Sequence, residues 1–318
     1  MRIKKVNEIN HLILSSTIDY SSDLICAELE KRELNYLRIN RDLFQEYEIV
    51  YSLQDNAFKF KVDGTWYSLS SKSIKSIYFR APVFLRTTGK ARPVEEQLKR
   101  SQWSAFIRNL IVLDKAVWMN YPVATYRAEN KLYQLKIAKG CGLTVPETYI
   151  GNSLAQNISR NKTYIIKSLD TALFYEGGKE MFTYSTIIKG TDLLSAEIQL
   201  APVIIQEYLS PKFDLRVTFV NNFMFTVAIT KQGVALEGDW RKSNKDNLTY
   251  TQVELPKIVE KKLVLLMKQL NLSFGGIDLA LVGDKYYFIE VNPTGEWGWL
   301  TSCAGLPIDK IIVDTLVR

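Results

Sequence analysis

The stretch that decides the fold is Phe288-Ile289-Glu290-Val291-Asn292-Pro293-Thr294-Gly295-Glu296-Trp297, near the end of the 318-residue sequence. It is typical of a β-strand that a proline ends. Side chains two residues apart share one face of a strand, so the Glu290 carboxylate and the Asn292 amide oxygen converge on one point. Such oxygen ligands suit Mg²⁺, which is usually completed by waters and substrate phosphates. The pattern indicates a magnesium–nucleotide site; a strand with a polar edge before a turn is the alternative.

A third oxygen ligand is available on the preceding strand, where Asp278 lies. The chain reverses at Gly283-Asp284. A two-residue turn there would set Asp278 opposite Ile289, whereas a longer loop through Lys285, or a bulge, would set it opposite Glu290. A metal site that includes Asp278 therefore predicts an odd loop or a β-bulge.

The composition is that of an ordinary folded protein of two or three packed subdomains, with 47% hydrophobic and 12% aromatic residues. The 41 Lys and Arg against 34 Asp and Glu give a net charge of +7, which favours an anionic partner. A nucleotide, a nucleic acid and an acidic peptide all fit that charge. Because the basic residues are dispersed rather than interleaved with aromatic ones, we expect no nucleic-acid partner.

Three distant cysteines, Cys26, Cys141 and Cys303, support neither a disulfide framework nor a zinc site. The first residues are charged and polar, and no run of eighteen apolar residues occurs. We therefore expect a cytoplasmic protein with no membrane partner. The single histidine, His11, has no serine or cysteine partner nearby in sequence, so we expect no hydrolase triad and expect His11 to be structural.

The N-terminal part opens as a β-α-β unit, with strands at 12–15 and 36–39 and a helix at 21–32. It lacks the glycine turn of dinucleotide-binding folds. Further predicted elements are a hairpin that turns at Asp63-Gly64, a strand at 74–79, and a helix at 95–113 whose apolar residues Trp103, Phe106, Ile107, Leu110 and Leu113 are expected in the core. Pro122 marks a boundary.

Arg80 follows the 74–79 strand directly, where ligand-binding loops of open α/β sheets gather. It is a candidate substrate-binding residue. The alternative is a solvated arginine at a strand end.

The second part of the sequence predicts a further α/β unit. Its elements are a helix at 128–139, a helix at 256–270, single strands at 147–150, 163–168, 181–189 and 201–209, and hairpins at 215–231 and 276–292. The segment Tyr175-Glu176-Gly177-Gly178-Lys179 is not a Walker loop. It suits a hairpin whose backbone N–H groups close over phosphates, although an ordinary glycine turn has the same composition.

Several motifs occur in one order: Asn130-Lys131, Gly140 to Pro146, Lys167, the glycine loop, Gln206 to Leu209, Asp214-x-Arg216, Asp239-Trp240-Arg241, Gly276-x-Asp278 and Glu290-Val291-Asn292-Pro293. From Trp118 onward this order resembles the ATP-grasp ligase superfamily. The N-terminal part resembles the pre-ATP-grasp domain of the microviridin-type, or graspetide, peptide maturases. The segments with the likeness to that branch are Trp118-Met119-Asn120-Tyr121-Pro122, Asn130-Lys131-Leu132-x-Gln134-Leu135, Asp239-Trp240-Arg241 and Asn292-Pro293-x-Gly295-x-Trp297. The branch often has Arg at the position of Ala81 and Gln at that of Glu296.

The resemblance implies an α/β, ATP-grasp fold with an N-terminal open-sheet pre-ATP-grasp domain. That domain would span residues 1–122, a central lid subdomain would span 123–202 with a leader-binding region at 181–200, and a C-terminal catalytic subdomain would span 203–318. It also implies an ADP-forming ligase that works through an acyl phosphate, with ATP and Mg²⁺ as cofactors.

The resemblance also assigns roles to single residues. Nucleotide binding falls to Lys131, Lys167, Gly177, Gly178, Gln206, Glu207, Tyr208, Leu209 and Asp214. The two lysines would hold the phosphates, and the 206–209 strand would bind adenine. Metal binding falls to Asp278, Glu290 and Asn292.

We expect arginines to bind the acyl phosphate, because a planar guanidinium binds phosphate oxygens bidentately. We expect Arg216 and Arg241 there, with Lys231 sharing the role. A cross-strand salt bridge is the alternative for Arg216.

In the graspetide branch, an Asp or Glu side chain of a precursor peptide is joined to a Thr or Ser hydroxyl or a Lys amine, which closes a ring. An acidic peptide would suit the positive net charge, and dimerisation is common in the branch. We expect Tyr184, Asp192 and Glu197 to bind the leader. Two other functions stay open: a glutathione-synthetase-like ligase that adds free amino acids, and a non-catalytic nucleotide sensor or nucleic-acid binder.

Overall fold

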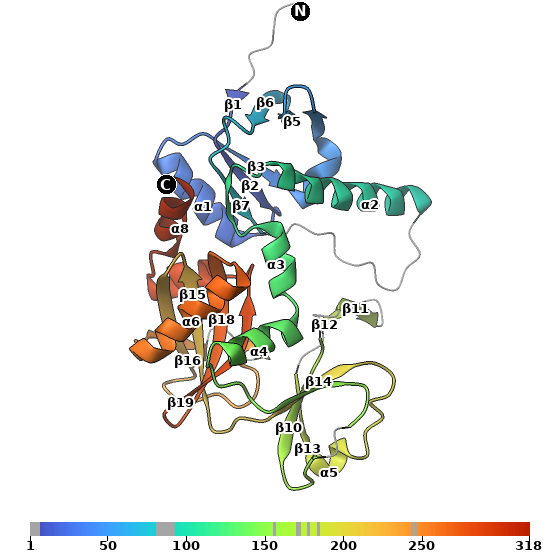
Figure 1. Ribbon diagram of the computed structural model, residues 1–318, viewed down its shortest axis with the longest axis vertical. Helices are drawn as coiled ribbons and strands as arrows, with labels where there is room; N and C mark the ends of the chain where they lie inside the picture. Colours follow the sequence, from blue (N-terminus) through green and yellow to red (C-terminus); the bar gives the residue numbers. More distant parts are fainter. Residues whose placement is uncertain are drawn as a thin grey trace, which may run out of the picture.

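The computed structural model (Figure 1) describes residues 7–80, 93–154, 157–169, 173–176, 179–182, 185–242, 244 and 247–318. Its N-terminal unit contains a parallel sheet in the order β3(Tyr36–Asn40), β2(His11–Ser15), β7(Ser76–Phe79), β8(Val117–Met119). Every residue of β2 and β7 is buried. Strands of a parallel sheet are usually covered on both faces, which fits this burial. The predicted β-α-β opening unit is confirmed by β2, α1 and β3. The helix α1(Tyr20–Lys31) begins after Asp19, whose carboxylate accepts a hydrogen bond from the Ser22 N–H.

A second sheet lies beside the first, in the order β1(Asn7–Glu8), β6(Thr65–Ser70), β5(Ala57–Val62), β4(Glu48–Ser52). The turn between β5 and β6 is the predicted one, and Asp63 and Gly64 both have positive φ, at 48° and 75°. These are the backbone conformations that a two-residue hairpin needs. The short helices η1(Arg41–Glu46) and η2(Leu110–Val112) and the long helix α2(Val94–Asn109) complete this unit. Ile107, Leu110 and Leu113 lie in its core, with Trp103 and Phe106 packed against it, as predicted.

The central unit is an antiparallel sheet in the order β13(Thr186–Lys189), β10(Thr163–Lys167), β14(Val203–Glu207), β9(Thr148–Gly151), with the short helix α5(Gly190–Leu193) beside it. A separate hairpin pairs β11(Leu173–Glu176) with β12(Lys179–Phe182). The predicted single strand at 181–189 is therefore wrong, because β12 pairs with β11 and β13 pairs with β10. Alternation of side chains continues across such a break, so periodicity cannot reveal a change of partner.

Two helices lead into this unit, α3(Pro122–Ala128) and α4(Lys131–Gly140). The predicted helix from Ala128 to Lys139 began too early, because Ala128 ends α3. Pro122 is the first residue of α3, a position where the missing N–H costs nothing. Both helices pack against the C-terminal unit through Ala124, Ala128 and Ala138.

The C-terminal unit is a five-stranded antiparallel sheet in the order β17(Thr249–Gln252), β16(Phe223–Thr230), β15(Phe213–Val220), β18(Phe274–Val282), β19(Lys285–Asn292). The helix α6(Lys257–Leu270) packs Leu263, Leu266 and Met267 into the core of this unit. The short 3₁₀ helix η3(Trp240–Lys242) lies between β16 and β17.

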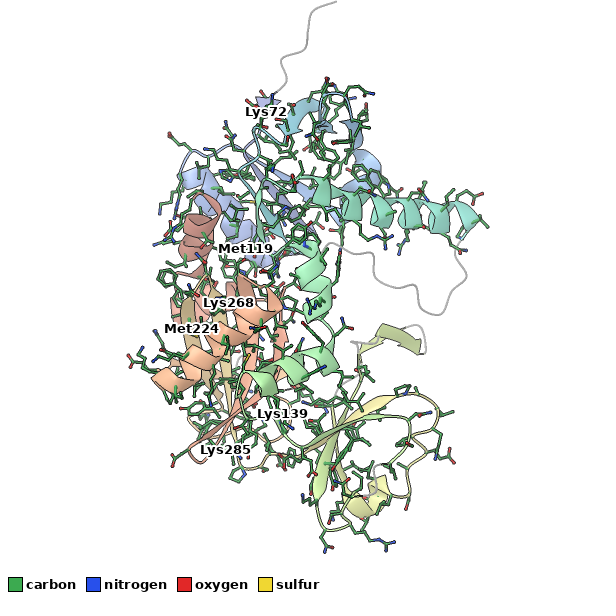
Figure 2. The ribbon with its side chains drawn as sticks, in the orientation of Figure 1. Lys72, Met119, Lys139, Met224, Lys268 and Lys285 are labelled. Carbon is green, nitrogen blue, oxygen red and sulfur yellow. The ribbon has the colours of Figure 1, made fainter. Side chains whose placement is uncertain are left out.

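The helices α7(Gly298–Ala304) and α8(Ile308–Leu316) were not predicted. Ile312 and Leu316 of α8 share a buried cluster with Ile25 and Leu29 of α1, and Figure 1 shows the two helices side by side. Met119, only 1% exposed, belongs to the same cluster and lies where the N-terminal and C-terminal units meet (Figure 2). No helix among the described residues is long and apolar enough to cross a membrane.

Candidate active site

Three predicted metal ligands project from the hairpin β18–β19. The turn at Gly283-Asp284 has two residues, with Val282 opposite Lys285, and a bulge after Asp278 restores the pairing of Asp278 with Glu290. Of the two predicted alternatives, an odd loop or a β-bulge, the structure has the β-bulge. Gly276 pairs with Asn292 in the same register, so Asp278, Glu290 and Asn292 share one face of the sheet.

Glu290 is surrounded by cations. Its two carboxylate oxygens lie 3.4 Å from Lys131 Nζ and 3.4 Å from Arg241 Nη1. Burial alone would raise the pKa of Glu290, but Lys131, Arg241 and Lys167 hold that pKa below its ordinary value. Glu290 is therefore an ionised carboxylate.

Asp278 forms an ion pair with Arg216, whose Nη1 donates to Asp278 Oδ1 at 2.9 Å. This is the cross-strand bridge that was the alternative interpretation of Arg216, and it crosses from β15 to β18. Burial raises the pKa of Asp278 despite Arg216, and the neighbouring Glu290 raises it further. Two charged carboxylates so close together favour a cation between them.

The Arg216 guanidinium is buried at 7% exposure because two glycines leave room for it. A Cβ atom at Gly276 would lie 2.2 Å from Arg216 Nη2, and one at Gly295 would lie 2.6 Å from it. Arg216 Nη2 also donates to the Glu296 carbonyl at 3.3 Å. Neither glycine could be replaced without moving Arg216.

A cavity opens between the central and C-terminal sheets; we call it the nucleotide cavity. All four residues predicted to bind adenine, Gln206 to Leu209, line it, together with Lys167, Asp214, Asp239, Arg241, Asp278 and Glu290. Lys167 Nζ donates to Gln206 Oε1 at 2.9 Å. Burial lowers the pKa of Lys167, as expected for a cation that a bound anion would complete.

Asp214 and Arg241 each have an ionic partner in this cavity. Lys212 Nζ lies 2.5 Å from the Asp214 carboxylate, whose pKa is nevertheless raised by burial. Arg241 Nε donates to Asp239 Oδ1 at 2.9 Å. Asp239 was noted in the sequence only as part of a motif, and its positioning of Arg241 was not predicted.

A second cavity, the phosphate cavity, shares Arg241 and Glu290 with the nucleotide cavity. Glu129, Lys131, Gln134, Asn292 and Pro293 also line it. The predicted metal ligands Glu290 and Asn292 and the predicted phosphate-binding Lys131 therefore face one space.

Two buried amides hold this arrangement, and both were seen only as motif residues in the sequence. Gln134 of α4 donates to the Val291 carbonyl at 2.7 Å and accepts from the Val291 N–H at 2.9 Å, which fixes the strand between Glu290 and Asn292. Asn120 donates to the Pro293 carbonyl at 2.9 Å and to the Phe274 carbonyl at 2.8 Å. Such side-chain bonds to backbone of distant strands have no local sequence signal.

Arg80 is buried rather than solvated, with a side chain only 5% exposed. Its Nε donates to Asp19 Oδ2 at 3.0 Å, its Nη2 to Glu296 Oε1 at 2.5 Å, and its Nη1 to the Gly295 carbonyl at 3.2 Å. It lines a third cavity, the interdomain cavity, with Ser15, Ser16, Ile18, Asp19, Arg41, Tyr126, Glu129, Thr294 and Glu296.

The remaining predicted residues lie elsewhere. Lys231 is exposed in a turn closed by its backbone bonds to Val234 and lines none of the three cavities. Asp192 and Glu197 are exposed on the central unit, in and after α5. Gly177, Gly178 and Tyr184 lie outside the described residues.

The donor set fits a magnesium ion that a nucleotide completes. Asp278, Glu290 and Asn292 offer only oxygens, which Mg²⁺ prefers. The described residues contain no group of three or more His, Cys, Asp and Glu side chains that could enclose a metal by themselves. Phosphate oxygens and water molecules would supply the rest of the coordination.

Comparisons with known proteins agree with this geometry. No family model matches the chain. The macrocyclase MdnC from Microcystis aeruginosa MRC, solved with its precursor peptide MdnA, has a TM-score of 0.83 and 26% identity, covering 97% of this chain and 99% of that one. An ATP-grasp ligase from Chryseobacterium gregarium, associated with a ribosomally synthesised and modified peptide and solved with ADP and a leader and core peptide, has a TM-score of 0.78 and 23% identity, covering 98% and 97%.

The curated glutathione synthetase of Nostoc sp. (strain PCC 7120 / SAG 25.82 / UTEX 2576) is 24% identical over 246 residues, covering 73% of this chain and 69% of that protein. The predicted fold is confirmed, since both structures match nearly the whole chain and the second of them is an ATP-grasp ligase. With a cleft suited to a nucleotide and an acidic strand pair beside it, the chain is an ADP-forming ATP-grasp ligase with the whole-chain architecture of the macrocyclases.

Proposed function

We propose that this enzyme uses ATP to activate Asp or Glu side chains of a ribosomally made precursor peptide and joins them to Thr or Ser hydroxyls or to Lys amines, which closes macrocycles. The observation that supports this most is the likeness to a peptide-bound macrocyclase, which extends over 97% of the chain. This likeness includes the N-terminal unit, which lines the interdomain cavity. A peptide is therefore the partner that we propose.

The nucleotide would bind with its adenine against Gln206 to Leu209 and its phosphates between Lys131 and Lys167. Asp278, Glu290 and Asn292 would hold Mg²⁺, which when bound neutralises charge on the phosphates. Lys167 and Lys131 are already oriented by Gln206 and Glu290. Little rearrangement is then needed when the nucleotide enters.

In the first step, an oxygen of the peptide carboxylate attacks the γ-phosphorus and the bond to ADP breaks. The acyl phosphate formed would lie in the phosphate cavity, where Arg241 faces both it and the nucleotide cavity. In the second step, the nucleophile bonds to the acyl carbon and inorganic phosphate leaves. Arg216 is buried against Asp278 and, in this proposal, orients that carboxylate.

Leader binding by the central unit belongs to the same proposal. Asp192 and Glu197 are exposed beside the edge strand β13, where a peptide would reach them, and Tyr184 precedes that strand. A cytoplasmic location suits an enzyme whose cysteines Cys26, Cys141 and Cys303 are all free.

The test is peptide-dependent turnover. The enzyme is incubated with ATP, Mg²⁺ and the product of a short neighbouring reading frame that has a Thr- and Asp/Glu-rich tail. We expect ADP release that requires the peptide, and a peptide mass lower by one water for each ring. A leader-deleted peptide is the control and should react more slowly.

Activity of the glutathione-synthetase type would give a different result. ADP release driven by free amino acids, with no change in any precursor peptide, would contradict the proposed function.

A further inference from the structure

A short loop after Pro293 lies between two arginines that come from different units of the protein. Arg80, directly after the N-terminal strand β7, donates from Nη1 to the Gly295 carbonyl at 3.2 Å. Arg216, from the C-terminal strand β15, donates from Nη2 to the next carbonyl, that of Glu296, at 3.3 Å. The two guanidinium groups therefore bind consecutive peptide groups of one loop.

Arg216 depends on this loop for its orientation. Its Nη1 donates to Asp278 Oδ1 at 2.9 Å, and its Nε is buried without a hydrogen-bond partner among the described residues. The Glu296 carbonyl is thus the second acceptor that orients the guanidinium group. Because a Cβ atom at Gly295 would lie only 2.6 Å from Arg216 Nη2, the loop backbone contacts the guanidinium group directly. A shift of the loop would move Arg216.

Arg80 is itself held in place from two sides. Its side chain is only 5% exposed. Its Nε donates to Asp19 Oδ2 at 3.0 Å, and its Nη2 lies 2.5 Å from Glu296 Oε1. Asp19 in turn accepts from Ser15 Oγ at 2.6 Å. A guanidinium group can make these bonds and the bond to the Gly295 carbonyl at the same time, because its N–H groups form a rigid planar fork.

We propose that Arg80 is a positioning residue for the Mg²⁺ site. By holding the Gly295-Glu296 backbone it keeps Arg216 against Asp278, and so keeps Asp278 on the metal-binding face of the hairpin; this rests on the metal ligands of the proposed function. Arg80 lines the interdomain cavity but neither the nucleotide cavity nor the phosphate cavity, whereas Asp278 lines the nucleotide cavity. The packing of the N-terminal unit against this loop therefore sets the geometry of a magnesium ligand.

Three roles of Arg80 give different measurements. The sequence predicts that Arg80 binds substrate, and its loss would then raise the KM for the peptide. A merely structural arginine would lower the stability of the protein and leave Mg²⁺-dependent binding of ADP unchanged. A positioning arginine changes how strongly Mg²⁺ supports ADP binding and lowers kcat, with the peptide KM unchanged.

The test is ADP binding, measured by titration calorimetry with the full-length enzyme in Mg²⁺ and in EDTA. In Arg80→Lys, an ammonium group keeps the positive charge beside Asp19 but cannot reproduce the planar set of bonds that includes the Gly295 carbonyl. We expect ADP to bind roughly 10-fold more weakly in Mg²⁺, as is typical when a residue that orients a metal ligand is lost, and equally well in EDTA. In peptide-dependent turnover, kcat should fall by a similar factor.

Arg32→Lys is the matched control. Arg32 also joins the N-terminal unit to later residues, because it pairs with Asp314 and donates to the Lys310 carbonyl at 3.4 Å. It lines none of the three cavities. The Arg32→Lys variant should therefore bind ADP like wild type both in Mg²⁺ and in EDTA.

A double variant checks that Arg80 acts through Arg216. Gly276→Ala displaces the Arg216 guanidinium group directly. In that background, Arg80→Lys should weaken ADP binding in Mg²⁺ little further, since both changes act on one contact. Losses that multiply would show that the two changes act independently and would overturn the inference.

Two further outcomes would also overturn it: wild-type ADP binding in Mg²⁺ by Arg80→Lys, or a raised peptide KM with kcat unchanged. Should Arg80→Lys not fold, Arg80→Gln combined with Asp19→Asn removes both charges of the buried pair, and the same ADP measurements apply. Failure of the proposed function is distinguishable, because the wild-type enzyme would then bind ADP with Mg²⁺ but show no peptide-dependent turnover.

Discussion

At the scale of single residues, Lys167 is a buried lysine, and burial makes its charged form less favourable. Burial lowers its pKa, and Gln206 supplies one hydrogen bond in the absence of an anion. A phosphate would complete its shell with charge-assisted hydrogen bonds. Lys167 should therefore contribute more to nucleotide binding than to the stability of the fold.

We expect Lys167→Met to weaken ADP binding by about 10-fold to 100-fold, the equivalent of one charged hydrogen bond. The free energy of unfolding without nucleotide should stay close to that of wild type. Titration calorimetry with ADP measures the first and urea unfolding the second. Lys162→Met is the control, since Lys162 precedes the same strand but pairs with Glu147 on the surface; equal affinities in the two variants would disprove the assignment.

Gly276 gives a second test at this scale. A methyl group there would collide with the Arg216 guanidinium, which would have to leave Asp278. We expect Gly276→Ala to reduce peptide-dependent ADP release at least 10-fold with a much smaller fall in melting temperature. Gly140→Ala, at the end of α4 where a Cβ meets nothing within 4 Å, should be neutral or slightly stabilising. Full activity of Gly276→Ala would show that Arg216 need not stay beside Asp278.

At the scale of elements, the hairpin β18–β19 shows how far sequence reasoning reaches. A metal site that includes Asp278 and Glu290 predicted either an odd loop or a bulge, because a one-residue slip turns every side chain to the other face, and the structure has the bulge. The split between β12 and β13 was missed because strand periodicity does not encode pairing partners. The hairpin of β11 and β12 was predicted from composition, because a Gly-Gly pair between two strand-like segments favours a tight turn.

His11 makes the β2–β7 pair sensitive to acid. Its ring Nδ1 lies 2.8 Å from Ser76 Oγ, and burial, with Lys75 nearby, lowers its pKa from 6.5 to about 4. The folded protein then keeps His11 neutral while the unfolded chain takes up a proton below pH 6.5. The stability that His11 contributes is present above pH 6.5 and is lost as the pH falls toward 4.

Replacing His11 should flatten this dependence. Between pH 6.5 and about 4, we expect wild type to lose up to roughly 3 kcal/mol more than His11→Gln, because a tenfold change in proton affinity between the folded and unfolded chain is worth about 1.36 kcal/mol. Urea unfolding at the two ends of this interval measures the difference. Since the chain has a single histidine, the comparison isolates one group, and parallel slopes for the two proteins would contradict the assignment.

At the scale of the whole molecule, the site depends on contacts that no local pattern contains. Arg80 reaches Glu296 across 216 positions of sequence, and Asn120 reaches Pro293 across 173. The motifs themselves were recognisable because each is short and contiguous. Their convergence on one cleft could be inferred only through the resemblance to a known fold.

Arg80 and Arg32 join the N-terminal unit to later residues, Glu296 and Asp314. Because their ion pairs differ in burial, we expect their loss to lower the free energy of unfolding by different amounts. Arg80 and Asp19 have side chains 5% and 8% exposed, whereas Arg32 and Asp314 are 27% and 44% exposed. Arg80→Met would leave Asp19 buried without its cation, which costs about 3 kcal/mol or more. Arg32→Met should cost less than Arg80→Met because its pair with Asp314 is more exposed, although it also removes the 2.7 Å ion pair with Glu28, whose side chain is 9% exposed. Chemical denaturation of both variants checks the order, and equal losses would show that Asp19 finds another partner.

The packing of α8 on α1 also affects how the protein is made. Ile25 and Leu29 leave the ribosome well before Ile312 and Leu316, which cover them and are made almost three hundred residues later. During translation the nascent β-α-β unit therefore exposes the apolar face of α1. We expect chaperones that bind unfinished chains to cover this face.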